Sequence, residues 1–502
     1  MGRPGSFPGH SMAVAAASGL VPAVSWGWRI VEGRLSVAVP QGGEAVRSEF
    51  DMIVIGAGMA GLNATARAAE AGRTVALIER DEVGGTCLLR GCIPTKALVR
   101  SAEVAHEARR AAEFGIRVGA VDVDFPAVMA RIHAIVDKGV AGTRAWVTSF
   151  DGVELILGEA TFVGSGEISV GGRVVRAPRI ILATGAAPSR PPIPGLAETP
   201  HLVSDDVLQL TELPRRLVII GGGPIALELG QALGRLGAEV VIVEVQPRLL
   251  PSEEPEIVDA LAGYLLEEGI QIILGAEIKR VEPTAAGGAR LFLGTASTAR
   301  VLEADALLVA TGRAPAIAQL DLGAAGVLAT DHGVAVDARL ATNHVGIYAA
   351  GDVLGPPWGA FTHVARRLGV AVAENALGLN PHDVDPDVGP RAIFTDPELA
   401  TIGLTEDAAR AAGYRVKIGT GRFTGGKARA WGEERGFVKI VAEAGTGRLL
   451  GAHLLAYHGA DLIQPVAVAM STGTGAVTAI RQTAQIHPTL GEVVKAAVES
   501  IG

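Results

Sequence analysis

Two cysteines, Cys87 and Cys92, are the residues of this 502-residue chain whose type and spacing most strongly suggest chemistry. They lie in the run Gly-Gly-Thr-Cys-Leu-Leu-Arg-Gly-Cys-Ile-Pro-Thr-Lys, and the chain has no other cysteine. On a regular α-helix their Cα atoms would be about 8.6 Å apart, beyond the roughly 4.4–6.8 Å that a disulfide bond tolerates. A bond between them therefore requires a break in the helix, and Gly91 would permit one.

The chemistry expected of this pair is reversible oxidation. A strained, accessible disulfide is reduced more easily than a structural one. Lys96 follows Cys92 by four residues, so a helix through both would carry them on one face, where the ammonium group would lower the thiol pKa. The alternatives are a structural cross-link and a pair of buried free thiols. A cross-link is disfavoured because so short a loop would add little stability to a fold of this size.

A dinucleotide-binding pattern precedes the cysteines. A buried strand over 51–55 leads into the run Gly56-Ala-Gly58-Met-Ala-Gly61, an alanine-rich helix follows, and a strand over 74–78 ends beside Glu79. Glycines at these positions let the backbone approach a pyrophosphate at a helix N-terminus. Glu79 would accept hydrogen bonds from ribose hydroxyls.

The same pattern recurs later in the chain. A strand over 217–220 is followed by Gly221-Gly-Gly223-Pro-Ile-Ala226, and a second strand over 240–243 ends beside Glu244. The first glycine and the acid are 23 residues apart in both copies (79 − 56 and 244 − 221). Two complete units at one spacing predict two nucleotide-binding folds. The Glu244 carboxylate would repel a 2′-phosphate, which favours NAD over NADP, although Arg248 lies nearby in the sequence.

The order of the two units suggests which cofactor each one binds. The cysteines follow the second strand of the first unit, so its ligand should exchange electrons with sulfur. A flavin does so, and a nicotinamide can then give or take hydride. We therefore expect FAD in the first unit and NAD in the second.

Composition sets the broad class of protein. The length suggests about three domains, and 49% hydrophobic with 19% charged residues is typical of a globular chain. A net charge of −9 gives no support for nucleic-acid binding. No segment is long and apolar enough to span a membrane, and the cysteine usage predicts no metal site and a cytoplasmic location. Residues 1–47 show no clear periodicity, and we expect a disordered extension or a start site assigned too far upstream.

Several further motifs occur in a fixed order along the chain. They are Ala183-Thr184-Gly185, Ala310-Thr-Gly312-Arg-Ala-Pro315, Ile347-Tyr-Ala-Ala-Gly-Asp352, the segment 393–405, and His487-Pro-Thr-Leu-Gly-Glu492. Together with the cysteine run and the nucleotide units, they make residues 48–502 resemble the class I pyridine nucleotide-disulfide oxidoreductases. The resemblance implies an α/β fold with an FAD-binding Rossmann-like domain, an inserted NAD-binding Rossmann-like domain and a C-terminal α+β dimerisation domain.

The resemblance also implies domain boundaries and a shared active site. The FAD domain would span 48–195, the NAD domain 196–315, a return segment completing the FAD domain 316–388, and the dimerisation domain 389–502. Two chains would form a homodimer, in which the C-terminal His-Pro segment of one chain reaches the cysteines of the other.

Each matched residue receives a role from the resemblance. Cys87 would exchange with a substrate disulfide, and Cys92 would contact the flavin. His487 would move the proton of the substrate-facing thiol, with Glu492 orienting its ring. Lys96 and Glu228 would pair beside the flavin and the nicotinamide, and Asp352 would bind the ribityl and phosphate part of FAD. The complete set expected to bind the cofactors is Gly56, Gly58, Gly61, Glu79, Lys96, Thr184, Gly185, Gly221, Gly223, Glu228, Glu244, Gly312 and Asp352.

Within the family, Glu244 and the His487–Glu492 pair favour oxidation of a small dithiol by NAD, with dihydrolipoamide as the first choice. The alternatives are a mercuric reductase-like enzyme, an NADH oxidase or quinone reductase, and a flavin-bound subunit docked to a lipoyl domain in a multienzyme complex. The tail after Glu492 has no cysteine pair, which counts against mercury as the substrate. Two features depart from the family pattern: Leu88-Leu89-Arg90 between the cysteines, and Pro224 in the second glycine loop.

Overall fold

The computed structural model describes residues 28–31, 34–37, 47–294, 299–358, 361–386, 389–472 and 475–501. The chain divides into two units, Met1–Arg47 and Ser48–Gly502. In the first unit, the described residues include a hairpin of β1 (Trp28–Val31) and β2 (Arg34–Val37). The rest of the extension expected over 1–47 lies outside the described residues, apart from Arg47.

A five-stranded parallel sheet forms the first nucleotide-binding fold, in the order β22-β9-β3-β4-β5. Its strands are β3 (Met52–Ile55), β4 (Val75–Glu79), β5 (Val153–Leu157), β9 (Ile180–Leu182) and β22 (Ile347–Ala349). The central strand β3 is buried at every residue, as expected for a parallel sheet covered on both faces. β22 follows the second fold in sequence, so the chain returns to complete the first sheet.

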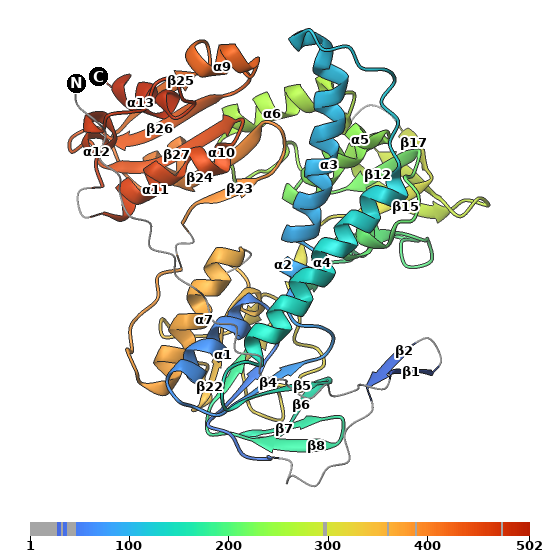
Figure 1. Ribbon diagram of the computed structural model, residues 1–502, viewed down its shortest axis with the longest axis vertical. Coiled ribbons are helices and arrows are strands. Elements are labelled where there is room, and N and C mark those ends of the chain that lie inside the picture. The colour runs from blue at the N-terminus through green and yellow to red at the C-terminus, as the bar shows by residue number, and fades with distance from the viewer. Residues whose placement is uncertain are drawn as a thin grey trace, which may run out of the picture. The chain divides into compact units, whose positions relative to one another are not determined.

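Two helices from distant parts of the chain pack together on this sheet, α1 (Met59–Glu70) and α7 (Thr362–Leu377) (Figure 1). They approach so closely that a Cβ added at Gly369 of α7 would lie 2.3 Å from the Ala60 carbonyl oxygen of α1. After β4 the chain forms α2 (Gly85–Leu89), α3 (Cys92–Arg110) and α4 (Phe125–Val147). The position of α7 matters for the site because its first residue lies beside a cysteine.

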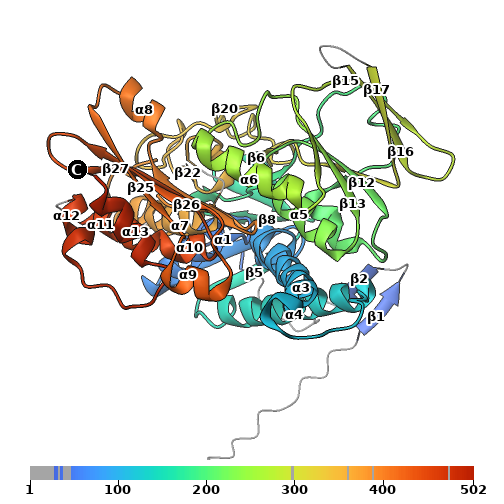
Figure 2. The ribbon, with the colours of Figure 1, turned by 90° about the horizontal axis from the view of Figure 1, so that it is seen from above.

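A second five-stranded parallel sheet forms the other nucleotide-binding fold, in the order β11-β18-β12-β13-β14. Its strands are β11 (Leu202–Val203), β12 (Arg216–Ile220), β13 (Glu239–Val243), β14 (Gln271–Ile273) and β18 (Ala306–Val309). Its helices are α5 (Pro224–Leu236) and α6 (Pro255–Glu267). α3 of the first fold packs against α5 of the second (Figure 2), so the cysteine-bearing segment lies where the two folds meet.

Two short strands, β10 (Ala186–Pro188) and β19 (Arg313–Pro315), pair antiparallel where the chain passes between the folds. Each fold also carries a three-stranded antiparallel sheet. These strands are β6 (Ala160–Gly164), β7 (Glu167–Val170) and β8 (Arg173–Arg176) in the first fold, and β15 (Glu277–Pro283), β16 (Ala289–Gly294) and β17 (Ala299–Ala304) in the second. The shorter elements are η1 (Ala111–Phe114), η2 (Ser204–Gln209), β20 (Ala329–Thr330), β21 (Gly333–Val334) and η3 (Asp352–Leu354).

The C-terminal part is built on an antiparallel sheet in the order β23-β24-β27-β26-β25. Its strands are β23 (Arg391–Ile393), β24 (Glu398–Gly403), β25 (Val416–Arg422), β26 (Phe437–Glu443) and β27 (Leu449–Ala456). Its helices are α8 (Glu406–Ala411), α9 (Gly426–Trp431), α10 (Gly459–Leu462), α11 (Gln464–Ser471), α12 (Val477–Gln482) and α13 (Glu492–Glu499).

The architecture confirms the expected fold class of two Rossmann-like folds followed by an α+β domain. None of the helices in the described part of the chain combines the length and apolarity that a bilayer crossing requires.

Candidate active site

The segment between the two cysteines is a broken helix. Cys87 lies in α2, and Cys92 is the first residue of α3. Arg90 ends α2 with φ −141°, and Gly91 precedes α3 with φ −123° and ψ −107°. A Cβ added at Gly91 would lie 3.0 Å from the Thr86 carbonyl oxygen, so a side chain here would crowd α2. The break agrees with the interruption expected from the spacing of the cysteines.

The two sulfurs are half-buried free thiols that share one hydrogen bond. The Cys87 thiol lowers the pKa of Cys92 to about 6 by donating to its sulfur, against the opposing effect of burial. The Thr362 hydroxyl and the Lys96 ammonium group also lower the pKa of Cys92. The shared hydrogen bond, followed by burial, raises the pKa of Cys87. The lowered pKa of Cys92, together with its position at the start of α3, favours this sulfur as the one that carries negative charge in the reduced pair.

Lys96 and Glu228 meet at the junction of the two folds. Lys96 Nζ lies 2.6 Å from Glu228 Oε2, and the Glu228 residue is only 7% exposed. The other carboxylate oxygen, Oε1, accepts a 2.9 Å hydrogen bond from the backbone N–H of Phe394, whose ring lies 4.3 Å from Lys96 Nζ. The structure thus brings together α3, α5 and the segment leading into β24 at one ion pair.

His487 and Glu492 form a second pair, at the start of α13. His487 Nδ1 lies 2.9 Å from Glu492 Oε1, and Oε2 accepts a 2.9 Å hydrogen bond from the Thr489 N–H. The Thr489 N–H, followed by His487, lowers the pKa of Glu492. The His487 side chain is 76% exposed, and among the described residues of this chain no hydrogen bond joins it to either cysteine. Within one chain, the contacts of the described residues do not link the His487 pair to the cysteines.

The first glycine loop is shaped for close backbone contact. Gly56 has φ +104°, and a Cβ added there would lie 2.3 Å from the Ala183 carbonyl oxygen. A Cβ added at Gly61 would lie 1.8 Å from the Gly56 carbonyl oxygen. Gly58 is the N-cap residue of α1. At the end of β4, Glu79 Oε2 accepts a 2.7 Å hydrogen bond from the Ala57 N–H of this loop. Burial raises the pKa of Glu79.

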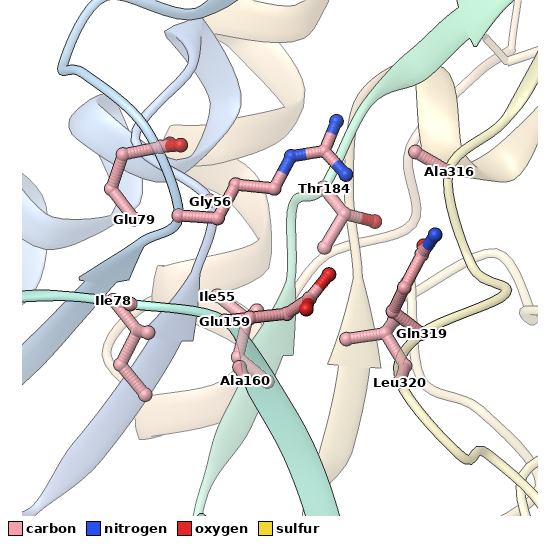
Figure 3. A pocket seen from close by; sticks show the side chains of 12 residues that line it. Ile55, Gly56, Ile78, Glu79, Glu159, Ala160, Thr184, Ala316, Gln319 and Leu320 are labelled. Carbon is pink, nitrogen blue, oxygen red and sulfur yellow. The ribbon is translucent and has the colours of Figure 1, made fainter. Parts of the chain in front are cut away.

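A pocket lies at this edge of the first sheet (Figure 3). It is lined by Ile55, Gly56, Ile78, Glu79, Arg80, Gly158, Glu159, Ala160, Thr184, Ala316, Gln319 and Leu320. The side chains of Glu159, Thr184 and Gln319 point toward the same space. Thr184 Oγ1 is buried and has no hydrogen-bond partner among the described residues, so it is available to a bound ligand. Asp352 begins η3, three residues after β22 ends, and Gly185 lies next to Thr184.

The second glycine loop repeats this geometry. Gly221 has φ +114°, and a Cβ added there would lie 2.5 Å from the Ala310 carbonyl oxygen. Glu244 Oε2 accepts a 2.5 Å hydrogen bond from the Gly222 N–H. Gly223 caps α5, and a Cβ there would meet no atom within 4 Å, so the space above it is open. Gly312, with φ +112°, follows β18 as Gly185 follows β9.

The two departures from the family pattern have local explanations. Pro224 is the first residue of α5, a position where the fixed φ of proline suits a helix and its missing N–H costs nothing. Arg90 forms an ion pair with Asp81, in the loop after Glu79, and so ties the cysteine segment to the first nucleotide unit. Leu88 packs against α4, where a Cβ added at Gly139 would lie 2.5 Å from its Cδ1 atom.

Sequence reasoning missed two residues at this site, Thr362 and Phe394. Thr362 Oγ1 lies 3.2 Å from Cys92 Sγ, across 270 residues of sequence. Phe394 lies in the segment 393–405, which was recognised without a role for that residue. A signal existed for Thr362, because it follows the Gly-Asp352 motif by ten residues at the start of a helix.

A dithiol beside two dinucleotide-binding folds defines a two-cofactor oxidoreductase. The family model for pyridine nucleotide-disulphide oxidoreductases matches residues 50–376, and the model for their dimerisation domain matches residues 389–498. The chain therefore belongs to the pyridine nucleotide-disulphide oxidoreductase family.

Relatives carry more than one named activity. The chain is 36% identical over 466 residues to dihydrolipoyl dehydrogenase of Bacillus subtilis, covering 89% of this chain and 97% of that protein. It is 37% identical over 454 residues to mercuric reductase of Bacillus cereus, covering 90% and 71%. The HOCl-induced flavoprotein disulfide reductase RclA of Escherichia coli has a similar structure, with a TM-score of 0.81 and 30% identity over 90% of this chain and 100% of that chain.

Membership of this family confirms the expected cofactors, FAD and NAD(H). The described residues fit both. The first loop has a glycine cradle that a Cβ would fill, and the unpartnered Thr184 hydroxyl faces its pocket. The second loop has the same cradle at Gly221 and open space above Gly223.

Proposed function

We propose that this protein oxidises a small dithiol, with dihydrolipoamide as the best candidate, and passes the electrons to NAD. The observation that carries the proposal is the His487–Glu492 pair, with Nδ1 and Oε1 2.9 Å apart. A carboxylate on one ring nitrogen leaves the other nitrogen to accept a proton, which a dithiol must lose as it is oxidised.

The cysteines would exchange with the substrate in two steps. A substrate thiolate attacks the Cys87 sulfur of the Cys87–Cys92 disulfide, forming a mixed disulfide and releasing Cys92 as a thiolate. The second substrate thiolate then attacks the substrate sulfur of that mixed disulfide, which gives the cyclic disulfide product and returns Cys87 as a leaving thiolate that takes up a proton. The lowered pKa of Cys92 supports its role as the first leaving group.

The proton would be handled by the second subunit. His487 is exposed, and among the described residues no hydrogen bond joins it to the cysteines of its own chain. Residues 389–498 match a dimerisation domain. We infer a homodimer in which the partner subunit's His487 takes one proton from the dithiol, while Glu492 of that subunit stabilises the imidazolium form. The other proton remains on Cys87.

The remaining residues would hold the two cofactors. Bound FAD and NAD supply a two-electron path from the dithiol to the nicotinamide. Lys96 and Glu228 place a cation and an anion where the two folds meet, and Glu244 and Glu79 would bind ribose hydroxyls. The backbone at Gly56, Gly58, Gly61, Gly185, Gly221, Gly223 and Gly312 and the side chains of Thr184 and Asp352 would complete the two sites.

The boundaries proposed for the parts that carry these sites are 48–195 and 316–388 for the FAD domain, 196–315 for the NAD domain and 389–502 for the dimerisation domain. The chain crossings at β10 and β19 and the return of β22 to the first sheet support them. A lipoyl domain is the macromolecular partner that this substrate would imply.

Reduction of mercuric ion is the second candidate, because a mercuric reductase is as similar to this chain as a dihydrolipoyl dehydrogenase. We rank it lower because Cys87 and Cys92 are the chain's two cysteines. Mercury as a substrate would have to be held by the redox pair alone.

The test is the initial rate of NADH formation from dihydrolipoamide and NAD by the purified protein. A fast rate that the Cys87→Ser substitution abolishes is expected. The matched control is Ser101→Ala, which should retain the rate. Ser101 lies on the same α3 helix, and in the described part of the chain its hydroxyl bonds only to the Ala97 carbonyl oxygen. A negligible rate, with NADH still reducing the bound flavin, would move the substrate to another disulfide, a metal ion or a quinone.

A further inference from the structure

We propose that Thr362 is a further catalytic residue, whose hydroxyl donates a hydrogen bond to the Cys92 sulfur and stabilises the thiolate formed there. The inference rests on the proposed function, because a thiolate at Cys92 matters only if the cysteine pair cycles between disulfide and dithiol. It adds to that function a group from the return segment of the chain that acts on the reacting sulfur itself.

The contact has the geometry of a hydrogen bond. Thr362 Oγ1 lies 3.2 Å from Cys92 Sγ. The hydroxyl also interacts with the Cys87 thiol, whose pKa it lowers, and it has no further partner among the described residues. A thiolate has no proton to give and can only accept, and in that state the hydroxyl must therefore be the donor.

The fold holds the hydroxyl in place. Thr362 is the first residue of α7, and Cys92 is the first residue of α3. The close approach of Gly369 to Ala60 fixes α7 against α1, which begins at the first glycine loop. The N-termini of α3 and α7 therefore both lie next to the Cys92 sulfur. The positive ends of the two helix dipoles favour a negative charge there.

The other groups that face Cys92 explain why this hydroxyl is needed. Cys87 from α2 donates its thiol proton, and Lys96 from α3 contributes a positive charge. Glu228 from α5 lies 2.6 Å from Lys96 and neutralises part of that charge. When Cys87 forms a mixed disulfide with substrate, its proton is gone. Thr362 is then the neutral donor that stays on Cys92 while it leaves.

The test uses the complete flavin-loaded protein in a Cys87→Ser background, where Cys92 is the chain's one remaining thiol. The measurement is the ultraviolet absorbance of the thiolate as a function of pH, taken as a difference from the Cys87→Ser/Cys92→Ser protein. Thr362→Val removes the hydroxyl at nearly constant volume, and Thr362→Ser keeps it. The matched control is Thr65→Val, a fully buried hydroxyl of α1 that has no partner among the described residues.

We expect Thr362→Val to raise the midpoint for Cys92 by about one pH unit, the size that one hydrogen bond to a charged group supplies. Thr362→Ser and Thr65→Val should leave the midpoint near that of the background protein. If Thr362→Val does not fold, the comparison of Thr362→Ala with Thr362→Ser gives the same answer.

Equal midpoints with and without the hydroxyl would overturn the proposal. A shift that Thr65→Val reproduces would do so as well, because it would assign the effect to loss of any buried hydroxyl in this fold. No dithiol substrate enters the measurement. Failure of dihydrolipoamide oxidation would therefore refute the proposed function while leaving this result unchanged.

Discussion

Glu79 and Glu244 occupy equivalent positions in the two nucleotide-binding folds and make the same backbone hydrogen bonds. Each carboxylate accepts a hydrogen bond from the N–H of the second residue of its glycine loop. Each also accepts one from the N–H of the residue two positions after the glutamate itself. These donors are Asp81, at 3.0 Å from Glu79, and Gln246, at 2.7 Å from Glu244. These backbone bonds hold the carboxylate at the carboxyl end of its strand. Its negative charge is therefore fixed where a ribose would bind.

The first prediction concerns the choice between NAD and NADP. Glu244→Gln keeps an acceptor for the loop but removes the charge that repels a 2′-phosphate. We expect kcat/KM for NADP to rise by roughly tenfold, a change of about 1.4 kcal/mol, and kcat/KM for NAD to fall. Steady-state kinetics with both coenzymes measures this. The matched control is Glu239→Gln, at the exposed start of the same strand, which should leave both values unchanged. If Glu244→Gln left the ratio of kcat/KM for NADP to kcat/KM for NAD unchanged, Glu244 would not be the residue that selects the coenzyme.

The second prediction concerns the Lys96–Glu228 pair. Glu228→Gln leaves a half-buried ammonium group without its counter-charge, beside the Phe394 ring. Because Lys96 is about one-third exposed, we expect a loss of only about 1–2 kcal/mol in the free energy of unfolding. The rate at which NADH reduces the bound flavin should fall at least tenfold. Stopped-flow absorbance measures the rate, and an unchanged rate in a folded variant would remove Glu228 from the nicotinamide site.

Residues that lie in short motifs could be identified from the sequence, whereas residues brought together by tertiary packing could not. The glycines, Glu79, Glu244 and the cysteines lie in short patterns whose spacing carries the chemistry. The contacts of Thr362 with Cys92 and of Phe394 with Glu228 span 270 and 166 residues. No local pattern specifies such pairs, because they depend on how α7 and the C-terminal sheet dock.

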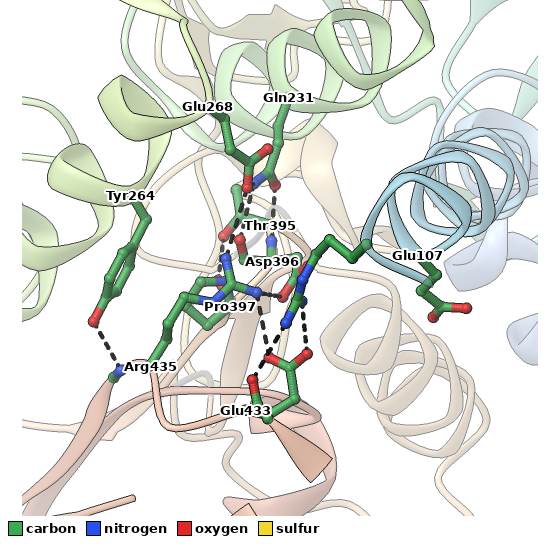
Figure 4. A network of polar contacts seen from close by, with 12 residues as sticks. Glu107, Gln231, Tyr264, Glu268, Thr395, Asp396, Pro397, Glu433 and Arg435 are labelled. Atoms are coloured by element: carbon green, nitrogen blue, oxygen red, sulfur yellow. Dashed lines mark hydrogen bonds and ion pairs between the residues drawn. The ribbon is translucent and has the colours of Figure 1, made fainter. Parts of the chain in front are cut away.

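At the scale of elements, α5 has a buried polar stripe that joins two domains. Glu228, Gln231 and Arg235 lie on one face and are all at least 93% buried. Gln231 Oε1 accepts a 2.7 Å hydrogen bond from the Asp396 N–H (Figure 4). Arg235 forms a 2.8 Å ion pair with the Asp396 carboxylate. The helix was predictable from the glycine loop before it, whereas its buried polar face was not, since polar residues at this spacing normally face solvent.

The same interface contains an acid that should make stability depend on pH. Glu398, the first residue of β24, accepts a 2.8 Å hydrogen bond from the Ala460 N–H. Burial raises its pKa to about 7, with Asp461, Glu103 and Asp396 adding to the effect. The pKa of Glu398 in the folded protein lies above the unfolded value of 4.5, so the folded state binds the proton more tightly. The contribution of this proton to the free energy of unfolding is therefore full at low pH and is lost as the pH rises through about 7.

The third prediction follows from that sign. Glu398→Gln keeps an acceptor for Ala460 and removes the titration. Between pH 5 and pH 8 the free energy of unfolding of the variant should rise by about 2 kcal/mol relative to that of the wild type. Urea unfolding at the two pH values measures this gain. A difference between variant and wild type that is the same at both pH values would show that Glu398 does not titrate in this window.

In the molecule as a whole, the residues proposed to react lie in two different parts of the chain. The cysteines and the two nucleotide folds belong to residues 50–376, whereas the exposed His487–Glu492 pair belongs to the dimerisation domain. The resemblance predicted this division and the return of the chain to its first sheet. The registers of the antiparallel sheets could not be predicted, because they depend on side-chain packing between strands.

The fourth prediction uses this division. A Cys87→Ser protein and a His487→Gln protein should each be nearly inactive as pure dimers. Dissociating and reassociating an equal mixture should give hybrid dimers in which one site has both an intact cysteine pair and an intact histidine. The activity should recover to about one quarter of wild type, since about half the dimers are hybrids and each has one working site. Absence of recovery in a mixture that forms hybrids would place cysteines and histidine of each site on one chain.

The proposed reaction requires that Cys87 and Cys92 form a disulfide that accepts electrons. The most direct measurement is the number of free thiols per chain, counted in denaturant after anaerobic treatment of the oxidised protein with NADH or dihydrolipoamide. We expect about two new thiols per chain with either reductant, and none in a Cys87→Ser/Cys92→Ser protein. An unchanged thiol count in a protein whose flavin is fully reduced would contradict it.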